Sequence, residues 1–168
     1  MKIRSVLMVA VAVALISGWS TQGIAQTVPH KASGSDATYV PGTGAYFGEG
    51  NGTHLGKHVI DGFVIPDGEF FPEEGVFFRG TFTGAQTAIA ADGSTITATL
   101  EGEVELVFNA DGAVEGLWFP AFEVTGGTGR FDGVSGAWEG VAINPPFDPS
   151  LSEWPFDWSV IGTVDLNN

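Results

Sequence analysis

The chain has 168 residues, no cysteine and few basic side chains. Without a thiol it cannot form a disulfide, a cysteine nucleophile or a metal site with sulfur ligands. Six Lys and Arg stand against 20 Asp and Glu, which gives a formal charge of -14. Because nucleic-acid affinity comes largely from clustered basic side chains, we expect no nucleic-acid partner.

Sequence motifs of common catalytic and metal sites are also missing. There is no Gly-x-Ser-x-Gly nucleophile elbow, and no glycine-rich loop is followed by the Lys-Ser/Thr pair of a phosphate-binding loop. His54 and His58 would stand about 13 Å apart on a strand, which is too far to chelate one ion unless the chain turns sharply at Gly56. Both side chains are therefore expected at the strand surface or at the lip of a pocket. Glu101, Glu103 and Glu105 alternate along one segment and indicate a solvated outer strand face. We therefore expect no metal and no cofactor, and we assign no catalytic residue.

Only one long apolar run is present, at residues 6–16, and it follows the positive charges of Lys2 and Arg4. Eleven apolar residues are too few to span a bilayer, which needs about 20. Small residues follow, and Gly23 and Ala25 suit a cleavage site after Ala25. The pattern predicts a signal peptide at 1–25 and a secreted or periplasmic protein, with no stable membrane anchor after cleavage.

The rest of the chain indicates an all-β fold. Residues 26–44 are rich in Ser, Thr, Gly and Pro and are interpreted as a flexible N-terminal lead-in. Beyond them apolar and polar residues alternate with period two, most clearly at 95–108, which predicts strands. Turns are expected at four sites: 66–68, 83–84, 91–94 and 109–112.

The spacing of these runs predicts about eight antiparallel strands, arranged as an up-and-down barrel or a sandwich. Many of the 25 glycines fall inside strand patterns, which favours a strongly coiled barrel formed by residues 45–168. Pro120 is expected at a sheet edge or bulge, and the proline-rich stretch 144–149 is expected to leave the sheet.

Aromatic residues are the most informative candidates for a function. Most of them are expected in the core, but an eight-stranded barrel can also enclose one small apolar ligand. Inward glycines beside large rings would leave a cavity, and the stretch 154–158 would form its mouth. The candidate ligand-binding residues are Phe78, Phe82, Trp118, Trp138, Trp154 and Trp158.

The stretch 124–136 reads Val-Thr-Gly-Gly-Thr-Gly-Arg-Phe-Asp-Gly-Val-Ser-Gly. It resembles a motif of the allene oxide cyclase barrel and dirigent-like superfamily, where a similar stretch joins two strands near the end of the barrel. The pattern Gly-x-Gly-Thr-His-Leu-Gly at 50–56 is similar to one in exported bacterial relatives. The resemblance implies the barrel fold and a structural role for the motif. It carries over no catalytic residue.

We therefore expect an exported barrel that binds a small hydrophobic or aromatic molecule without catalysis. One alternative is a cofactor-free cyclase or isomerase of the allene oxide cyclase type, acting by orienting its substrate. Another is an oligomeric component of the envelope or matrix, because relatives often form homo-oligomers.

Overall fold

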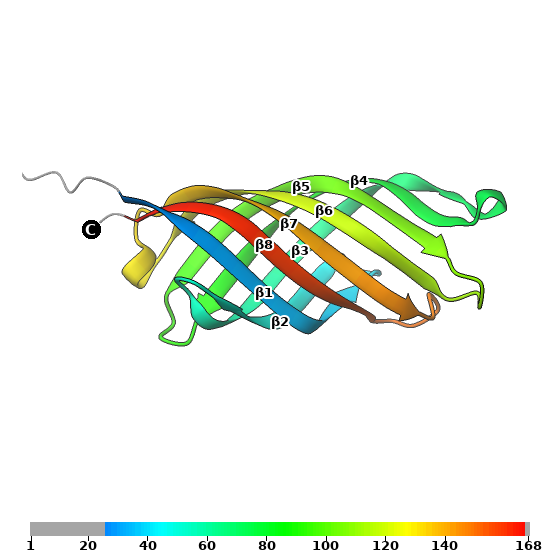
Figure 1. Cartoon of the computed structure of the whole chain (residues 1–168), viewed down its shortest axis with the longest axis horizontal. Coiled ribbons are helices and arrows are strands. Elements are labelled where there is room, and N and C mark those ends of the chain that lie inside the picture. Colours follow the sequence, from blue (N-terminus) through cyan, green and yellow to red (C-terminus); the bar gives the residue numbers. More distant parts are fainter. Residues whose placement is uncertain (1–25, 167–168) are drawn as a thin grey trace, which may run out of the picture.

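The structure is a computed structural model that describes residues 26–166. These residues form one closed antiparallel barrel in which each strand pairs with its neighbours in the chain and β8 pairs with β1 (Figure 1). The strands are β1 (Gln26–Val40), β2 (Ala45–Gly52), β3 (Gly56–Phe71), β4 (Val76–Ala90), β5 (Thr95–Phe108), β6 (Val114–Gly127), β7 (Ser135–Phe147) and β8 (Trp154–Leu166). Two short 3-10 turns, η1 (Pro72–Glu74) and η2 (Gly129–Phe131), lie at opposite ends of the barrel. The eight-stranded up-and-down barrel expected from the sequence is confirmed.

Alternation along β5 sorts its side chains as predicted. Ile96, Leu100 and Val104 are buried, while the carboxylates of Glu101 and Glu103 are exposed on the outer face. A period of two places successive side chains on opposite faces, so the inner row packs inside the barrel and the outer row is solvated. The core is therefore the barrel interior, and it is filled mainly by aromatic and branched aliphatic side chains.

Residues 26–40 differ from the expectation of a flexible lead-in, because they form β1 and pair with both β2 and β8. The barrel consequently begins at Gln26 and not at residue 45. A bulge at Asp36, which has a φ of 55°, shifts the register with both neighbouring strands. The bulge breaks the alternation of β1, which is why the sequence pattern did not reveal a strand there.

Two of the four expected turns are correct, and two lie inside long strands. Gly93 and Gly112 adopt φ values of 83° and 81° in the turns that precede β5 and β6. Residues 66–68 lie within β3 and residues 83–84 within β4. The glycines there serve close backbone packing, because a Cβ on Gly84 would lie 2.0 Å from the carbonyl oxygen of Phe63.

Prolines also stand in strands where the sequence did not predict them. Residues 144–147 belong to β7, so the proline-rich stretch leaves the sheet only after Phe147. Pro120 lies within β6, at a place where the pairing of β6 with β7 is interrupted. The closed barrel offers no edge, so an interruption of the ladder accommodates the missing N–H.

Within residues 26–166, no helix has the length and apolar character needed to cross a membrane. The predicted signal peptide, residues 1–25, lies outside the described residues.

Candidate functional site: an apolar cavity inside the barrel

A small cavity of about 70 Å³ lies inside the barrel. All eight strands contribute residues to its wall, and most of these residues are apolar. The lining residues are Tyr39, Tyr46, Ile60, Val64, Phe82, Gln86, Leu100, Trp118, Pro120, Phe122, Val141, Ala142, Asn144, Phe156, Trp158, Ser159 and Val160. This volume is far below the roughly 300–1,000 Å³ of pockets for drug-sized ligands, so the interior is close to filled.

Three of the six predicted ligand-binding residues line this cavity: Phe82, Trp118 and Trp158. Trp118 packs against Phe82, with ring centroids 5.2 Å apart. Each of these side chains lies on the inward face of its strand, β4, β6 or β8, as the alternation predicted. The barrel brings the three strands around one cavity.

The other three, Phe78, Trp138 and Trp154, lie away from the cavity. Trp138 is buried toward the η2 end, and Trp154 is buried at the opposite end. Phe78 is only partly buried and packs against the exposed ring of Phe70. They differ from the first three in their height along the barrel axis, which the sequence pattern does not encode.

The polar atoms of the cavity wall mostly satisfy one another. Trp118 Nε1 donates to Asn144 Oδ1 at 2.7 Å, and Asn144 Nδ2 donates to the carbonyl oxygen of Pro155 at 2.7 Å. Tyr46 Oη donates to Gln86 Oε1 at 3.1 Å. Burial raises the pKa of Tyr46 well above its usual range, and the charge of Asp61 adds to this effect. The phenol therefore stays protonated, and the site has hydrogen-bonding groups but no proton acceptor suited to neutral pH.

No Asp, Glu, His, Lys or Arg occurs among the described residues that line the cavity. General acid–base catalysis needs a titratable group with a pKa near the working pH, within reach of the substrate. Among the described lining residues, no carboxylate, imidazole, amine or guanidinium is within reach for this role.

The end of the barrel opposite η2 is closed by aromatic side chains. Trp154 is buried there and contacts the rings of Tyr39, Phe77 and Phe147, with centroid distances between 4.9 and 5.9 Å. Its Nε1 donates to the carbonyl oxygen of Leu151 at 3.1 Å. We name this group of rings the aromatic stopper. The stretch 154–158 begins in it and does not form the open mouth that the sequence predicted.

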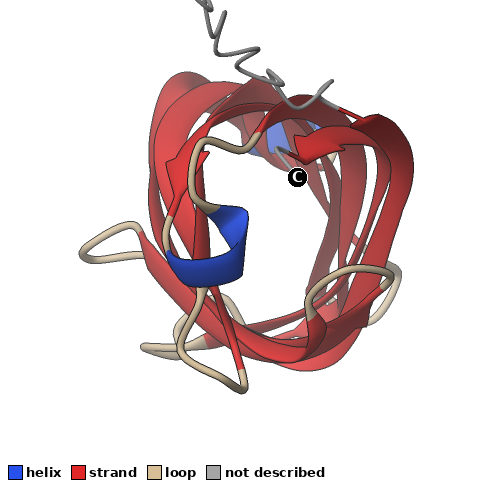
Figure 2. Cartoon of the chain, turned by 90° about the vertical axis from the view of Figure 1, so that its left-hand side faces the viewer, coloured by secondary structure: helices blue, strands red, loops and turns tan. Residues whose placement is uncertain are grey.

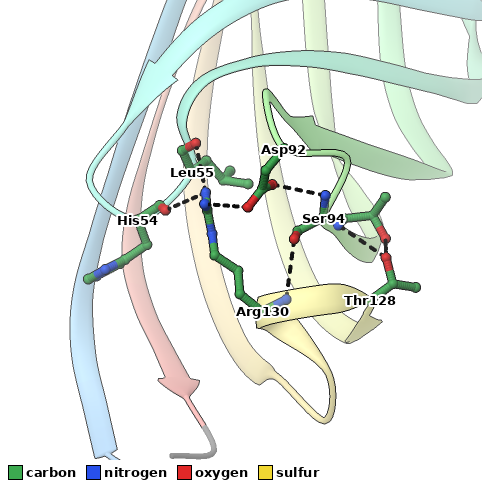
Figure 3. Close-up of polar contacts among 7 residues, drawn as sticks. His54, Leu55, Asp92, Ser94, Thr128 and Arg130 are labelled. Atoms are coloured by element: carbon green, nitrogen blue, oxygen red, sulfur yellow. Dashed lines mark hydrogen bonds and ion pairs between the residues drawn. The ribbon is translucent and has the colours of Figure 1, made fainter.

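Turn η2 lies at the rim of one end of the barrel (Figure 2). A network around Arg130, which we name the Arg130 latch, lies at this end (Figure 3). Arg130 Nη1 pairs with Asp92 Oδ2 at 2.7 Å, and Nη2 donates to the carbonyl oxygens of His54 and Leu55, each at 3.2 Å. The backbone N–H of Arg130 donates to Ser94 Oγ at 3.2 Å. The latch ties η2 to the turns before β3 and β5, so it holds three connections together at this end.

Phe131, which follows Arg130 in the motif, fills the space beneath the latch together with Leu55 and Val134; all three are buried. Gly129 has a φ of 62° and lets the chain turn back into the barrel end. The motif at 124–136 thus acts as a closure of the barrel.

A histidine cluster lies just inside the latched end. His30 is 1% exposed and stacks on Trp138 at 4.6 Å between ring centroids, and His54 stacks against it at 6.1 Å. Among residues 26–166, neither ring nitrogen of His30 has a hydrogen-bond partner. The pKa of His30 is lowered to about 4, mainly by desolvation and in smaller part by the charges of the nearby His54 and His58.

Sequence reasoning missed His30, because it falls in the segment interpreted as a lead-in. It also placed His58 at the strand surface or the pocket lip, whereas His58 is buried and its Nδ1 lies 2.9 Å from the carbonyl oxygen of Gly56. The sequence did contain a signal for the burial of His58, because it lies two residues from the inward Ile60 and therefore on the same face of β3. Across the described residues, no group of three or more metal-binding side chains could hold an ion.

Comparison with known proteins adds no relative. No protein-family model matches the chain, and neither a curated protein nor a solved structure is significantly similar to it.

Proposed function

We propose that the barrel binds a small uncharged, apolar molecule in its interior cavity, without catalysis. The observation that carries this proposal is the apolar space inside the barrel walled by Phe82, Trp118 and Trp158. Eight-stranded barrels either fill their interior or hold one small ligand, and this interior retains a space. Apolar cavities stay dry, so an apolar guest gains dispersion contacts without displacing bound water.

The cavity volume sets the size of the guest. Liquid water occupies about 30 Å³ per molecule, so about 70 Å³ corresponds to two waters. An engineered apolar cavity of about 150 Å³ admits benzene and xenon. We expect xenon to fit the present cavity, whereas a ligand as large as benzene has to displace a ring such as Trp158 or Phe122.

A cofactor-free cyclase or isomerase has less support, because the wall offers no titratable group that changes charge near neutral pH. Tyr39 and Tyr46 are the titratable residues of the lining, and burial raises the pKa of both phenols. A substrate could still be oriented by the Asn144 amide.

We also propose that the chain is an exported member of the allene oxide cyclase barrel and dirigent-like superfamily. Support comes from the glycine spacing at 124–136, from its position between β6 and β7, and from the eight-stranded up-and-down topology. The signal-peptide pattern of residues 1–25 supports export.

The binding proposal is tested by saturating the protein with xenon and recording methyl NMR spectra. We expect the methyl resonances of Ile60, Val64, Leu100 and Val160 to shift, because these residues line the cavity. Ala142→Leu adds three carbons to the cavity wall and should abolish the shifts. Ala137→Leu places the same change on the exposed face of β7 and should leave them intact. Shifts that are absent from the wild type, or that persist in Ala142→Leu, would contradict the proposal.

A further inference from the structure

Buried side chains pack at both ends of the barrel. The aromatic stopper around Trp154 closes one end, and the Arg130 latch with Phe131 closes the other. A guest therefore has to cross either one of these packed ends or the wall of the barrel.

Backbone pairing in the wall is interrupted between β1 and β2, at the bulge of β1, and also between β6 and β7. We name the interruption between β6 and β7 the seam, because it borders the cavity. Backbone pairing runs from Leu117 opposite Ile143 to Trp118 opposite Ala142, and resumes at Ala121 opposite Glu139. Residues 119–120 and 140–141 are not paired with each other. Pro120 has no N–H to donate across the seam, and Gly140 has no side chain to cover it.

The cavity and an outer hollow meet at the seam. The outer hollow lies on the solvent side of β1, β2, β6, β7 and β8. Four residues line both spaces: Pro120, Val141, Ser159 and Val160. Residues 120 and 141 belong to the unpaired segments themselves, so the cavity and the outer hollow share lining residues where the backbone pairing of the wall is interrupted.

The solvent side of the seam is apolar. Phe119 is 49% exposed and Ile161 is 57% exposed, and both line the outer hollow beside Val141. The charges in the same lining, Lys31 and Glu139, have opposite signs, so the hollow selects for neither sign. An uncharged apolar molecule would gather there by the hydrophobic effect.

We infer that uncharged apolar molecules reach the cavity sideways, through the seam between β6 and β7. This inference rests on the proposed binding function and concerns its route. The strands separate locally at residues 119–120 and 140–141, where few hydrogen bonds oppose the motion, while both ends stay closed. Local openings of this kind occur where backbone hydrogen bonds are sparse.

A reversible cross-link tests the route, and the absence of native cysteine gives a clean background. The variant Ala121→Cys/Glu139→Cys joins register partners at one end of the seam. Facing positions in an antiparallel pair lie about 4.5–5.5 Å apart at Cα, which suits a disulfide. Thr83→Cys/Glu101→Cys is the matched control, because it joins outward register partners on β4 and β5, where pairing is continuous.

The readout is the xenon exchange rate from saturation-transfer NMR, measured for oxidised and reduced forms of both variants. We expect oxidation at the seam to slow exchange by about tenfold or more while equilibrium occupancy stays unchanged. Oxidation of the control pair should leave the exchange rate within a factor of about two. Equal rates in the oxidised and reduced seam variants, with occupancy retained, overturn the route but leave the binding function standing. Absence of occupancy in every reduced form overturns the binding function and the route with it.

Gly140→Ala provides a second variant that needs no oxidation. A methyl group there would lie 3.1 Å from Pro120 Cγ, from the Ser159 carbonyl oxygen and from Val160 Cγ1, so small shifts can accommodate it. The added methyl group narrows the seam and should slow xenon exchange, as oxidation of the seam variant does. Exchange that is as fast as in the wild type, in a folded Gly140→Ala protein, contradicts the route.

Discussion

The buried imidazole of His30 should make the barrel sensitive to acid. In the folded state the pKa of His30 is lowered from 6.5 to about 4, first by desolvation and then by the charges of His54 and His58. In the unfolded chain it titrates near 6.5. Between these values the unfolded chain binds more protons, so the free energy of unfolding falls as the pH falls from 6.5 to 4.

The size of this effect follows from the pKa difference. One pKa unit corresponds to about 1.36 kcal/mol, so the full difference of about 2.5 units amounts to at most about 3.4 kcal/mol, and water that reaches the imidazole lowers this value. Domains of this kind have about 5–15 kcal/mol in total, so the loss is a large share. Burial also lowers the pKa of His58, against the opposing hydrogen bond to Gly56, which adds a loss in the same direction.

Urea unfolding followed by tryptophan fluorescence, at several pH values between 7.5 and 4, provides the assay. His30→Leu keeps an apolar side chain of similar size against Trp138 and removes the titrating group. The wild type should lose up to about 3 kcal/mol more than His30→Leu over this pH range. His54→Gln removes one of the two charges that lower the pKa of His30 but leaves its burial, so its loss should be smaller than that of the wild type and larger than that of His30→Leu. Parallel profiles for the wild type and His30→Leu would refute the reasoning.

Two further predictions concern stability at neutral pH. Arg130→Gln should lower the free energy of unfolding by about 1–3 kcal/mol, because it removes the bonds to the carbonyl oxygens of His54 and Leu55 together with an exposed ion pair. Arg79→Gln breaks only a similarly exposed ion pair, with Glu105, and should change the free energy of unfolding by less than about 1 kcal/mol. Thermal and urea unfolding compare the two variants, and equal losses would contradict a specific role for the latch. Asn144→Leu should lower the free energy of unfolding by about 1–3 kcal/mol, because it leaves the buried Trp118 Nε1 without an acceptor. Adding Trp118→Phe removes the donor as well and should recover part of this loss. Strictly additive effects in this double-mutant cycle would contradict the coupling of the two side chains.

Strands with uninterrupted alternation could be located from the sequence alone. The strand predicted at 95–108 is β5, with the same bounds, and its carboxylates face outward as expected. Phe108 is the exception in its inner row, because it lies at the end of the strand and is exposed. Strand β1 escaped detection because the bulge at Asp36 changes which face each residue occupies.

The candidate site was predictable only in part. Phe82, Trp118 and Trp158 face inward by alternation, yet so do Trp138 and Trp154, and the sequence does not say which inward side chains share a level. Level along the axis depends on the strand register around the barrel, which is set by pairing across all eight strands.

By itself, the sequence determined the chemical character of this protein: an acidic chain without cysteine, composed of strands with one apolar face, which closes into a barrel with an apolar interior. Tertiary structure alone decided that the interior is nearly full, that both ends are closed and that His30 is buried without a partner. It also placed the seam, where backbone pairing is interrupted beside the cavity, between β6 and β7. The physical reason is that composition and period fix which face of a strand is buried, whereas register and closure fix which buried side chains meet.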